Sequence, residues 1–159
     1  MDKQRRRFLK SGLVTGLLGL AAGVGLFIPR LVWAAWPSSA FQAKTLFGAL
    51  GPLFGNGSVN LTPADEDITL TVTDLAENGA VVPVTVSSRL PDVESITLLV
   101  DKNPNSLVAQ FKLAKNTQAY IKTNIKMAET SKVYAVVKSG DKLYSTNKKV
   151  KVTLGGCGN

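Results

Sequence analysis

The sequence predicts an all-β domain: an immunoglobulin-like antiparallel β-sandwich with a short N-terminal helix and a flexible C-terminal Gly-Gly-Cys-Gly arm. Two observations predict the sandwich. Beyond Asp65, short runs rich in Val, Ile and Thr alternate apolar and polar side chains with period two. Turn-favouring residues separate these runs at regular spacing. The two cysteines around a core tryptophan that mark antibody domains are missing, so the prediction concerns the architecture alone.

The N-terminal segment has the layout of an export signal. Arg5-Arg6-Arg7-Phe8-Leu9-Lys10 precedes a charge-free, glycine-rich apolar run over residues 11–28, and the paired arginines match the twin-arginine pattern. Cleavage is predicted after Ala34, with Ala40 as a second candidate site. We therefore predict export to the periplasm and three segments: a signal peptide at 1–34, a β-sandwich domain at 35–154 and an arm at 155–159.

An uncleaved membrane anchor is the alternative for this segment, because the apolar run is marginally long enough for a bilayer of about 30 Å. Its glycines disfavour a stable span. Removing residues 1–34 takes away six of the 19 basic residues and one of the 11 acidic residues, so the net charge falls from +8 to about +3. That small charge removes the main argument for nucleic-acid binding.

The remaining elements follow in chain order. The spacing of Phe41, Leu46, Phe47 and Leu50 predicts a short amphipathic helix over residues 41–50, which the glycines and Pro52 after it should end. Seven strands are then predicted, at residues 68–73, 80–88, 94–101, 107–113, 119–127, 132–138 and 142–154. The turns that separate them include Glu77-Asn78-Gly79, Leu90-Pro91-Asp92 and Ser139-Gly140-Asp141.

The composition excludes several classes of enzyme. The chain has no histidine and one cysteine, so it has no internal disulfide, no Ser-His-Asp triad, no Cys-His nucleophile pair and no histidine-ligated zinc or haem. We therefore expect no cofactor or metal and no self-sufficient hydrolase or cytochrome.

The one cysteine, Cys157, is the candidate site residue. It lies between Gly155 and Gly156 on one side and Gly158 on the other, and these glycines should leave the thiol mobile and unshielded. Cysteine is usually a buried residue, so this position indicates a role other than core packing. From the residues alone, covalent carrier chemistry, an intermolecular disulfide and an incidental exposed thiol all stay open.

The last predicted strand carries four lysines, Lys142, Lys148, Lys149 and Lys151. One interpretation is a solvated face whose lysines protect a sheet edge from aggregation. The other is an environment that attracts anions and favours the thiolate of Cys157.

The chain resembles the SoxY family, the sulfur-carrying subunits of the bacterial thiosulfate-oxidation system. The twin-arginine signal, the predicted sandwich and Gly155-Gly156-Cys157-Gly158 carry this resemblance together. Internal stretches also resemble the family: Ala76-Glu77-Asn78-Gly79, Val82-Pro83-Val84, Val100-Asp101-Lys102-Asn103-Pro104, Ile125-Lys126-Met127-Ala128 and Val150-Lys151-Val152-Thr153. The chain departs from the family in one place, since Asn159 stands where a second glycine is usual.

The resemblance implies a covalent carrier rather than an enzyme, with sulfur intermediates attached to Cys157 and with Gly155, Gly156 and Gly158 giving the arm its reach. It implies a heterodimer with a SoxZ-like subunit. It further implies a c-type cytochrome that conjugates thiosulfate to the cysteine, a manganese-containing hydrolase that releases sulfate and, in some organisms, a sulfane dehydrogenase. The competing hypothesis is a non-catalytic periplasmic interaction module whose terminal cysteine forms cross-links.

Overall fold

The computed structural model describes residues 37–55 and 59–154 and confirms the predicted all-β class. The predicted signal peptide and the Gly-Gly-Cys-Gly arm lie outside the described residues. Within the described ranges, no helix is long and apolar enough to cross a membrane. The described elements are α2 (Ser38–Phe41), α3 (Leu46–Phe54), β1 (Leu61–Pro63), β2 (Ile68–Val72), β3 (Leu75–Asn78), β4 (Val82–Ser88), β5 (Val93–Val100), β6 (Leu107–Lys112), β7 (Tyr120–Ile125), β8 (Ser131–Ser139) and β9 (Lys142–Leu154).

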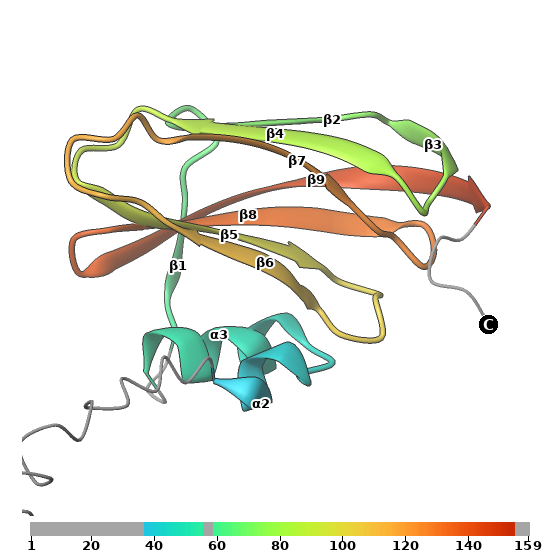
Figure 1. Ribbon diagram of the computed structural model, residues 1–159, viewed down its shortest axis with the longest axis horizontal. Helices are drawn as coiled ribbons and strands as arrows, with labels where there is room; N and C mark the ends of the chain where they lie inside the picture. Colours follow the sequence, from blue (N-terminus) through green and yellow to red (C-terminus); the bar gives the residue numbers. More distant parts are fainter. Residues whose placement is uncertain (1–36, 56–58, 155–159) are drawn as a thin grey trace, which may run out of the picture. The chain divides into compact units, whose positions relative to one another are not determined.

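The strands form two sheets that pack face to face (Figure 1). The large sheet has the order β1-β9-β8-β5-β6, with β3 paired to the far part of β9. The small sheet has the order β2-β4-β7. The helices α2 and α3 lie on the face of the large sheet that points away from the small sheet. The domain therefore has three layers, with the large sheet in the middle.

Each face of the large sheet buries its own apolar cluster because side chains alternate along a strand. On β5, Ile96 and Leu98 point between the sheets into the main core, together with Val84 and Val86 of β4. Leu99, one residue further along, points the other way and packs with Leu50 of α3. This alternation explains why β5 is buried from Ser95 to Val100.

The seven predicted strands are all present, but the prediction missed two short ones. β1 and β3 both pair with β9 in parallel, so these two ladders differ from the antiparallel arrangement that was expected. A strand of three or four residues shows too little of a period-two pattern to be recognised. In β3 the stretch Glu77-Asn78-Gly79 also has the composition of a turn, and Glu77 and Asn78 belong to the strand instead.

The predicted helix bounds at 41–50 were wrong, since two helices cover this region. α3 begins after Thr45, whose hydroxyl accepts a hydrogen bond from the Gly48 N–H at 3.1 Å. A Cβ atom on Gly48 would come within 2.8 Å of that hydroxyl, so the glycine makes room for the cap. The helix continues through Pro52 to Phe54, because packing of Leu50 against the sheet outweighs local propensity.

We expect Leu98→Ala to lower the free energy of unfolding by about 2–5 kcal/mol, since Leu98 is fully buried between the sheets and its removal leaves a cavity. Urea unfolding monitored by circular dichroism measures the change. The control is Thr69→Ala on the exposed face of β2, which should shift stability by less than about 0.5 kcal/mol. Equal effects for the two variants would contradict this description of the core.

Candidate functional site

The candidate site is the C-terminal end of β9, because the chain leaves the described residues there. Cys157 and its neighbours Gly155, Gly156 and Gly158 lie outside the described range. The last described residue is Leu154, which is 64% exposed. What the structure determines is therefore the position and rigidity of the point from which the arm starts.

β9 is the longest strand of the described residues and runs the whole length of the large sheet (Figure 1). One side pairs with β8 from Lys142 to Val150. The other side pairs with β1 near its start and with β3 near its end. Strand β9 thus has a neighbouring strand over nearly its whole length, on both sides at Leu143–Ser145 and on one side elsewhere.

Hydrogen bonds hold the last four residues of β9 in place. The Leu154 carbonyl accepts from the Gly79 N–H at 2.7 Å, and the Lys151 N–H donates to the Asp74 carbonyl at 2.9 Å. On the other side, the Val152 N–H donates to the Thr130 hydroxyl at 2.9 Å. Paired backbone donors and acceptors resist local opening, so the strand should stay ordered up to Leu154.

The position of Leu154 limits where the cysteine can act. Cys157 lies three residues further along, and each residue of extended chain spans at most about 3.6 Å. Its sulfur therefore stays within roughly 10–15 Å of the end of β9, including the length of the side chain. A protein that acts on this thiol must approach this end of the sandwich.

The four lysines of β9 separate into three environments. Lys142 lies at the far end of the strand, beside the β8–β9 turn. Lys148 points between the sheets at their margin, where its ammonium forms an ion pair with Asp74 at 3.1 Å and donates to the Val72 carbonyl at 2.9 Å. Lys149 and Lys151 are exposed on the outer face of the large sheet. The four lysines therefore do not form a single charged group.

A lysine of β8 joins Lys149 and Lys151. Lys132 lies directly opposite Lys149 in the antiparallel ladder and is exposed on the same face. We call Lys132, Lys149 and Lys151 the lysine strip. Among the described residues, none of the three forms an ion pair. Protection of a free edge accounts for Lys149 alone, which lies between the β1 and β3 pairings of β9, because β8 is an interior strand and Lys151 lies where β3 covers β9.

A shallow hollow of about 480 Å³ adjoins the strip, lined by Lys149, Lys151, Leu75 and Asp74. Leu75 is half exposed, and Asp74 forms the ion pair with Lys148. The hollow thus has two free ammonium groups, an apolar side chain and a carboxylate whose charge is offset. It lies within three residues of Leu154, which is about 10 Å along the strand.

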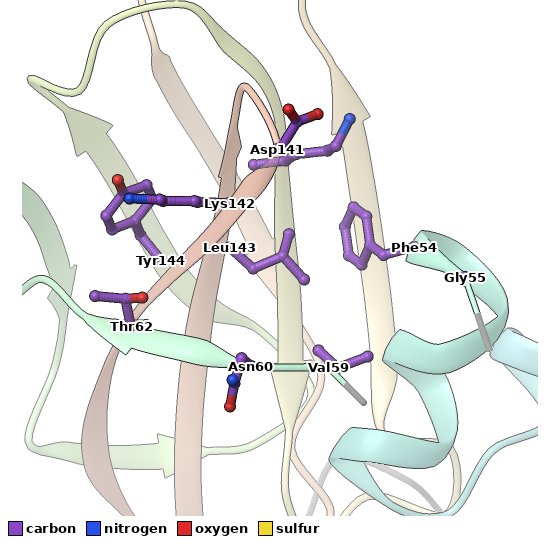
Figure 2. A pocket seen from close by; sticks show the side chains of 10 residues that line it. Phe54, Gly55, Val59, Asn60, Thr62, Asp141, Lys142, Leu143 and Tyr144 are labelled. Atoms are coloured by element: carbon purple, nitrogen blue, oxygen red, sulfur yellow. The ribbon is translucent and has the colours of Figure 1, made fainter. Parts of the chain in front are cut away.

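Another hollow of about 480 Å³ lies at the opposite end of β9, between α3 and the β8–β9 turn (Figure 2). Phe54, Val59 and Leu143 form its apolar part, with Asp141 and Lys142 near its rim. Leu154 is the twelfth residue after Lys142, which corresponds to about 40 Å of strand. The arm cannot reach this hollow, so it has no part in the chemistry of Cys157.

No catalytic cluster is found in the part of the chain that the structure describes. Within residues 37–55 and 59–154, no three His, Cys, Asp or Glu residues gather to hold a metal ion. Partial burial, with a smaller contribution from Asp101, raises the pKa of Tyr134 above its ordinary value. This tyrosine therefore stays protonated at neutral pH and gives no general base.

The sequence of this end of the chain matches a protein-family model. The model described as "Sulfur oxidation protein SoxY" matches residues 53–157, well over half of the sequence. The chain belongs to the SoxY family. The match covers the sandwich from β1 to β9 and ends at Cys157. The resemblance noted from the sequence is thereby confirmed at the level of the family.

Solved structures give the same result for the fold of this SoxY family member. The sulfur carrier protein SoxY from Chlorobium limicola f thiosulfatophilum is 32% identical, with a TM-score of 0.62; the match covers 69% of this chain and 97% of that one. A superoxide reductase (neelaredoxin) from Ignicoccus hospitalis is 12% identical, with a TM-score of 0.51, covering 58% of this chain and 94% of that one. The second likeness concerns the fold alone. The search of curated proteins returned no match.

Sequence reasoning missed three parts of this site: β3, Thr130 and Lys132. The register of the β8–β9 hairpin could have identified Lys132 from the sequence. The turn at Gly140-Asp141 pairs Ser139 with Lys142, and counting back along both strands from there places Lys132 opposite Lys149. No comparable signal was available for Thr130, because its contact with Val152 depends on the path of the loop before β8.

We expect Thr130→Val to loosen the end of β9, because the Val152 N–H loses its acceptor. The free energy of unfolding should fall by about 1 kcal/mol, and amide hydrogen exchange at Val152 should become faster. Hydrogen exchange followed by NMR measures this effect. The matched control, Thr130→Ser, keeps the hydroxyl and should keep the protection. Unchanged exchange in the valine variant would show that Thr130 does not hold the strand.

Proposed function

We propose that this protein carries sulfur intermediates covalently on Cys157 during periplasmic thiosulfate oxidation. Membership of the SoxY family supports the proposal, and the observation that carries it is that the family match extends to the only cysteine of the chain. The similar structure from Chlorobium is described as a sulfur carrier. The ordered end of β9 gives the arm a fixed starting point beside open solvent.

The attachment step is a two-electron oxidation. The Cys157 thiolate and the outer sulfur of thiosulfate form a sulfur–sulfur bond, and two electrons pass to a c-type cytochrome partner. The product is a cysteine S-thiosulfonate with one negative charge on its sulfonate. In the next step, water attacks this sulfonate sulfur within a manganese-containing hydrolase, and the bond between the two sulfurs of the former thiosulfate breaks. Sulfate and two protons leave, and a persulfide stays on Cys157.

This chain supplies the thiol and its presentation, and the partner enzymes supply the catalysis. A thiolate is the reactive form of cysteine and needs no resident base if the visiting enzyme provides the oxidant or the water. Where a sulfane dehydrogenase is present, it oxidises the remaining persulfide sulfur. Gly155, Gly156 and Gly158 would make the arm slim enough to enter such sites. Asn159 adds a side chain where the family usually has none.

Export and assembly belong to the same proposal. The twin-arginine signal at 1–34 would carry the folded chain to the periplasm, where the Sox enzymes act. There the sandwich would form a heterodimer with a SoxZ-like subunit. Arg5 and Arg6 support the proposed export, and membership of the SoxY family supports the proposed heterodimer.

Replacing Cys157 tests the carrier role directly. Mass spectrometry of the protein from thiosulfate-grown cells should find reductant-sensitive sulfur adducts on Cys157, and Cys157→Ser should lose both the adducts and turnover in a reconstituted thiosulfate assay. A cross-linking module makes the opposite prediction. In that case, Cys157→Ser abolishes a covalent dimer and leaves turnover intact.

Shortening the arm tests whether reach is needed. Deleting Gly155 and Gly156 removes about 7 Å of span, so turnover with the partner enzymes should fall at least about 10-fold. Reaction of the thiol with a small uncharged disulfide should change little, because that reagent comes to the cysteine. Deleting Asn159 instead leaves the span between Leu154 and Cys157 unchanged and serves as the control. Full turnover in the deletion variant would contradict a role for reach.

A further inference from the structure

The lysine strip is a feature that the carrier role alone does not explain. Lys132 and Lys149 are direct cross-strand neighbours, and like charges in that position destabilise a sheet. Lys151 adds a third charge two residues further along the same face of β9. In the described ranges, no carboxylate lies within ion-pair distance of any of the three.

The acidic groups near the strip are engaged or lie to its sides. Asp74, which lines the hollow, is paired with Lys148. Glu77 of β3 is exposed next to Thr153, and Asp101 follows β5 at the Lys132 end. Glu129 pairs with Lys102 at 3.4 Å. The outer face at the end of β9 therefore has an excess of positive charge over the nearby acids.

The strip also lies within reach of the arm. Lys151 is about 10 Å along β9 from Leu154, and Cys157 lies three residues beyond Leu154. A chain of that length that turns back can bring the thiol above the strip. With the thiol above the strip, ions that approach the cysteine would come within the Debye length of about 8 Å at physiological salt, so the ammonium groups would act on them.

We propose that the lysine strip and its hollow form an anion site that draws sulfur oxyanions to Cys157. The ligand class is small sulfur oxyanions with a terminal sulfonate, either free thiosulfate or the thiosulfonate end of the arm. Two ammonium groups beside Leu75 fit such a group, which presents charged oxygens on one side and a polarisable sulfur on the other. The identity of this ligand rests on the proposed function, but the attraction of anions does not.

The test compares two disulfide reagents on the purified, reduced protein. One is the dianion 5,5′-dithiobis(2-nitrobenzoate), and the other is uncharged 2,2′-dithiodipyridine. In both reactions the Cys157 thiolate attacks one sulfur, the reagent's sulfur–sulfur bond breaks and an aromatic thiol is released, which absorbance records. The second-order rate constant for the dianion divided by that for the uncharged reagent reports the attraction of anions. A change in the acidity of Cys157 affects both reactions and largely cancels in the ratio.

We expect the double substitution Lys149→Gln and Lys151→Gln to lower this ratio about 3- to 10-fold at low salt. The difference should shrink as the ionic strength rises from about 0.02 M to about 0.5 M. Lys132→Gln should cause a smaller fall. Replacing Lys149 and Lys151 with arginine keeps the charges, so Lys149→Arg and Lys151→Arg should keep the ratio.

The matched control is Lys142→Gln, which removes one charge from the same strand about 30 Å from Lys151. It should leave the ratio unchanged. An unchanged ratio in the Lys149 and Lys151 variant would overturn the anion site. An equal fall per charge in the Lys142 variant would also overturn it, since net charge rather than the strip would then be responsible. Neither result bears on whether Cys157 carries sulfur, which the adduct measurement decides separately.

Discussion

The hydrogen bonds between β3 and the end of β9 are the contacts on which the geometry of the C-terminal end depends. β3 comes from a chain segment that has just left the small sheet, and it pairs in parallel with Lys151, Val152 and Leu154. The Gly79 N–H then closes the ladder on the Leu154 carbonyl. Without this pairing, the residues after Val150 would have no neighbouring strand, with the Thr130 hydroxyl as a partner for Val152, and they would fray. With it, the arm starts from a fixed position at one end of a rigid sandwich.

The two ends of β9 consequently differ in the surface features that lie beside them. One end carries the hollow lined by Phe54 and Leu143, which lies far beyond the reach of a short arm. The other end carries Leu154, the lysine strip and a hollow between Leu75 and Lys151. Because a carrier cysteine acts only within the length of its tether, proximity to Leu154 decides which surface features can matter for sulfur chemistry.

The proposed carrier role would separate presentation of the thiol, by this chain, from catalysis by partner enzymes. It has no histidine, and its described residues bring no metal-ligating cluster together, while membership of the SoxY family associates it with sulfur oxidation. A carrier gains from this arrangement, because a thiol with no catalytic neighbours of its own can visit several enzymes without side reactions on the way. The proposed role of the lysine strip is consistent with this division, since positive charge attracts anions and does not itself catalyse a reaction.

Much of the fold could be predicted from the sequence because seven strands have five or more residues, which is long enough for a strand pattern to be recognised. The candidate site could be predicted only in part. The composition singled out Cys157 as the one thiol, and local chemistry suggested that the lysines of the last strand mattered. Which of those lysines stay free, however, depends on partners far away in the chain. Asp74 forms an ion pair with Lys148, Lys132 lies opposite Lys149, and the Thr45 hydroxyl caps α3 by accepting from the Gly48 N–H. Strand pattern and residue type are local properties that a sequence shows directly, whereas charge environment and strand ends are set by contacts between distant segments, which only the tertiary structure decides.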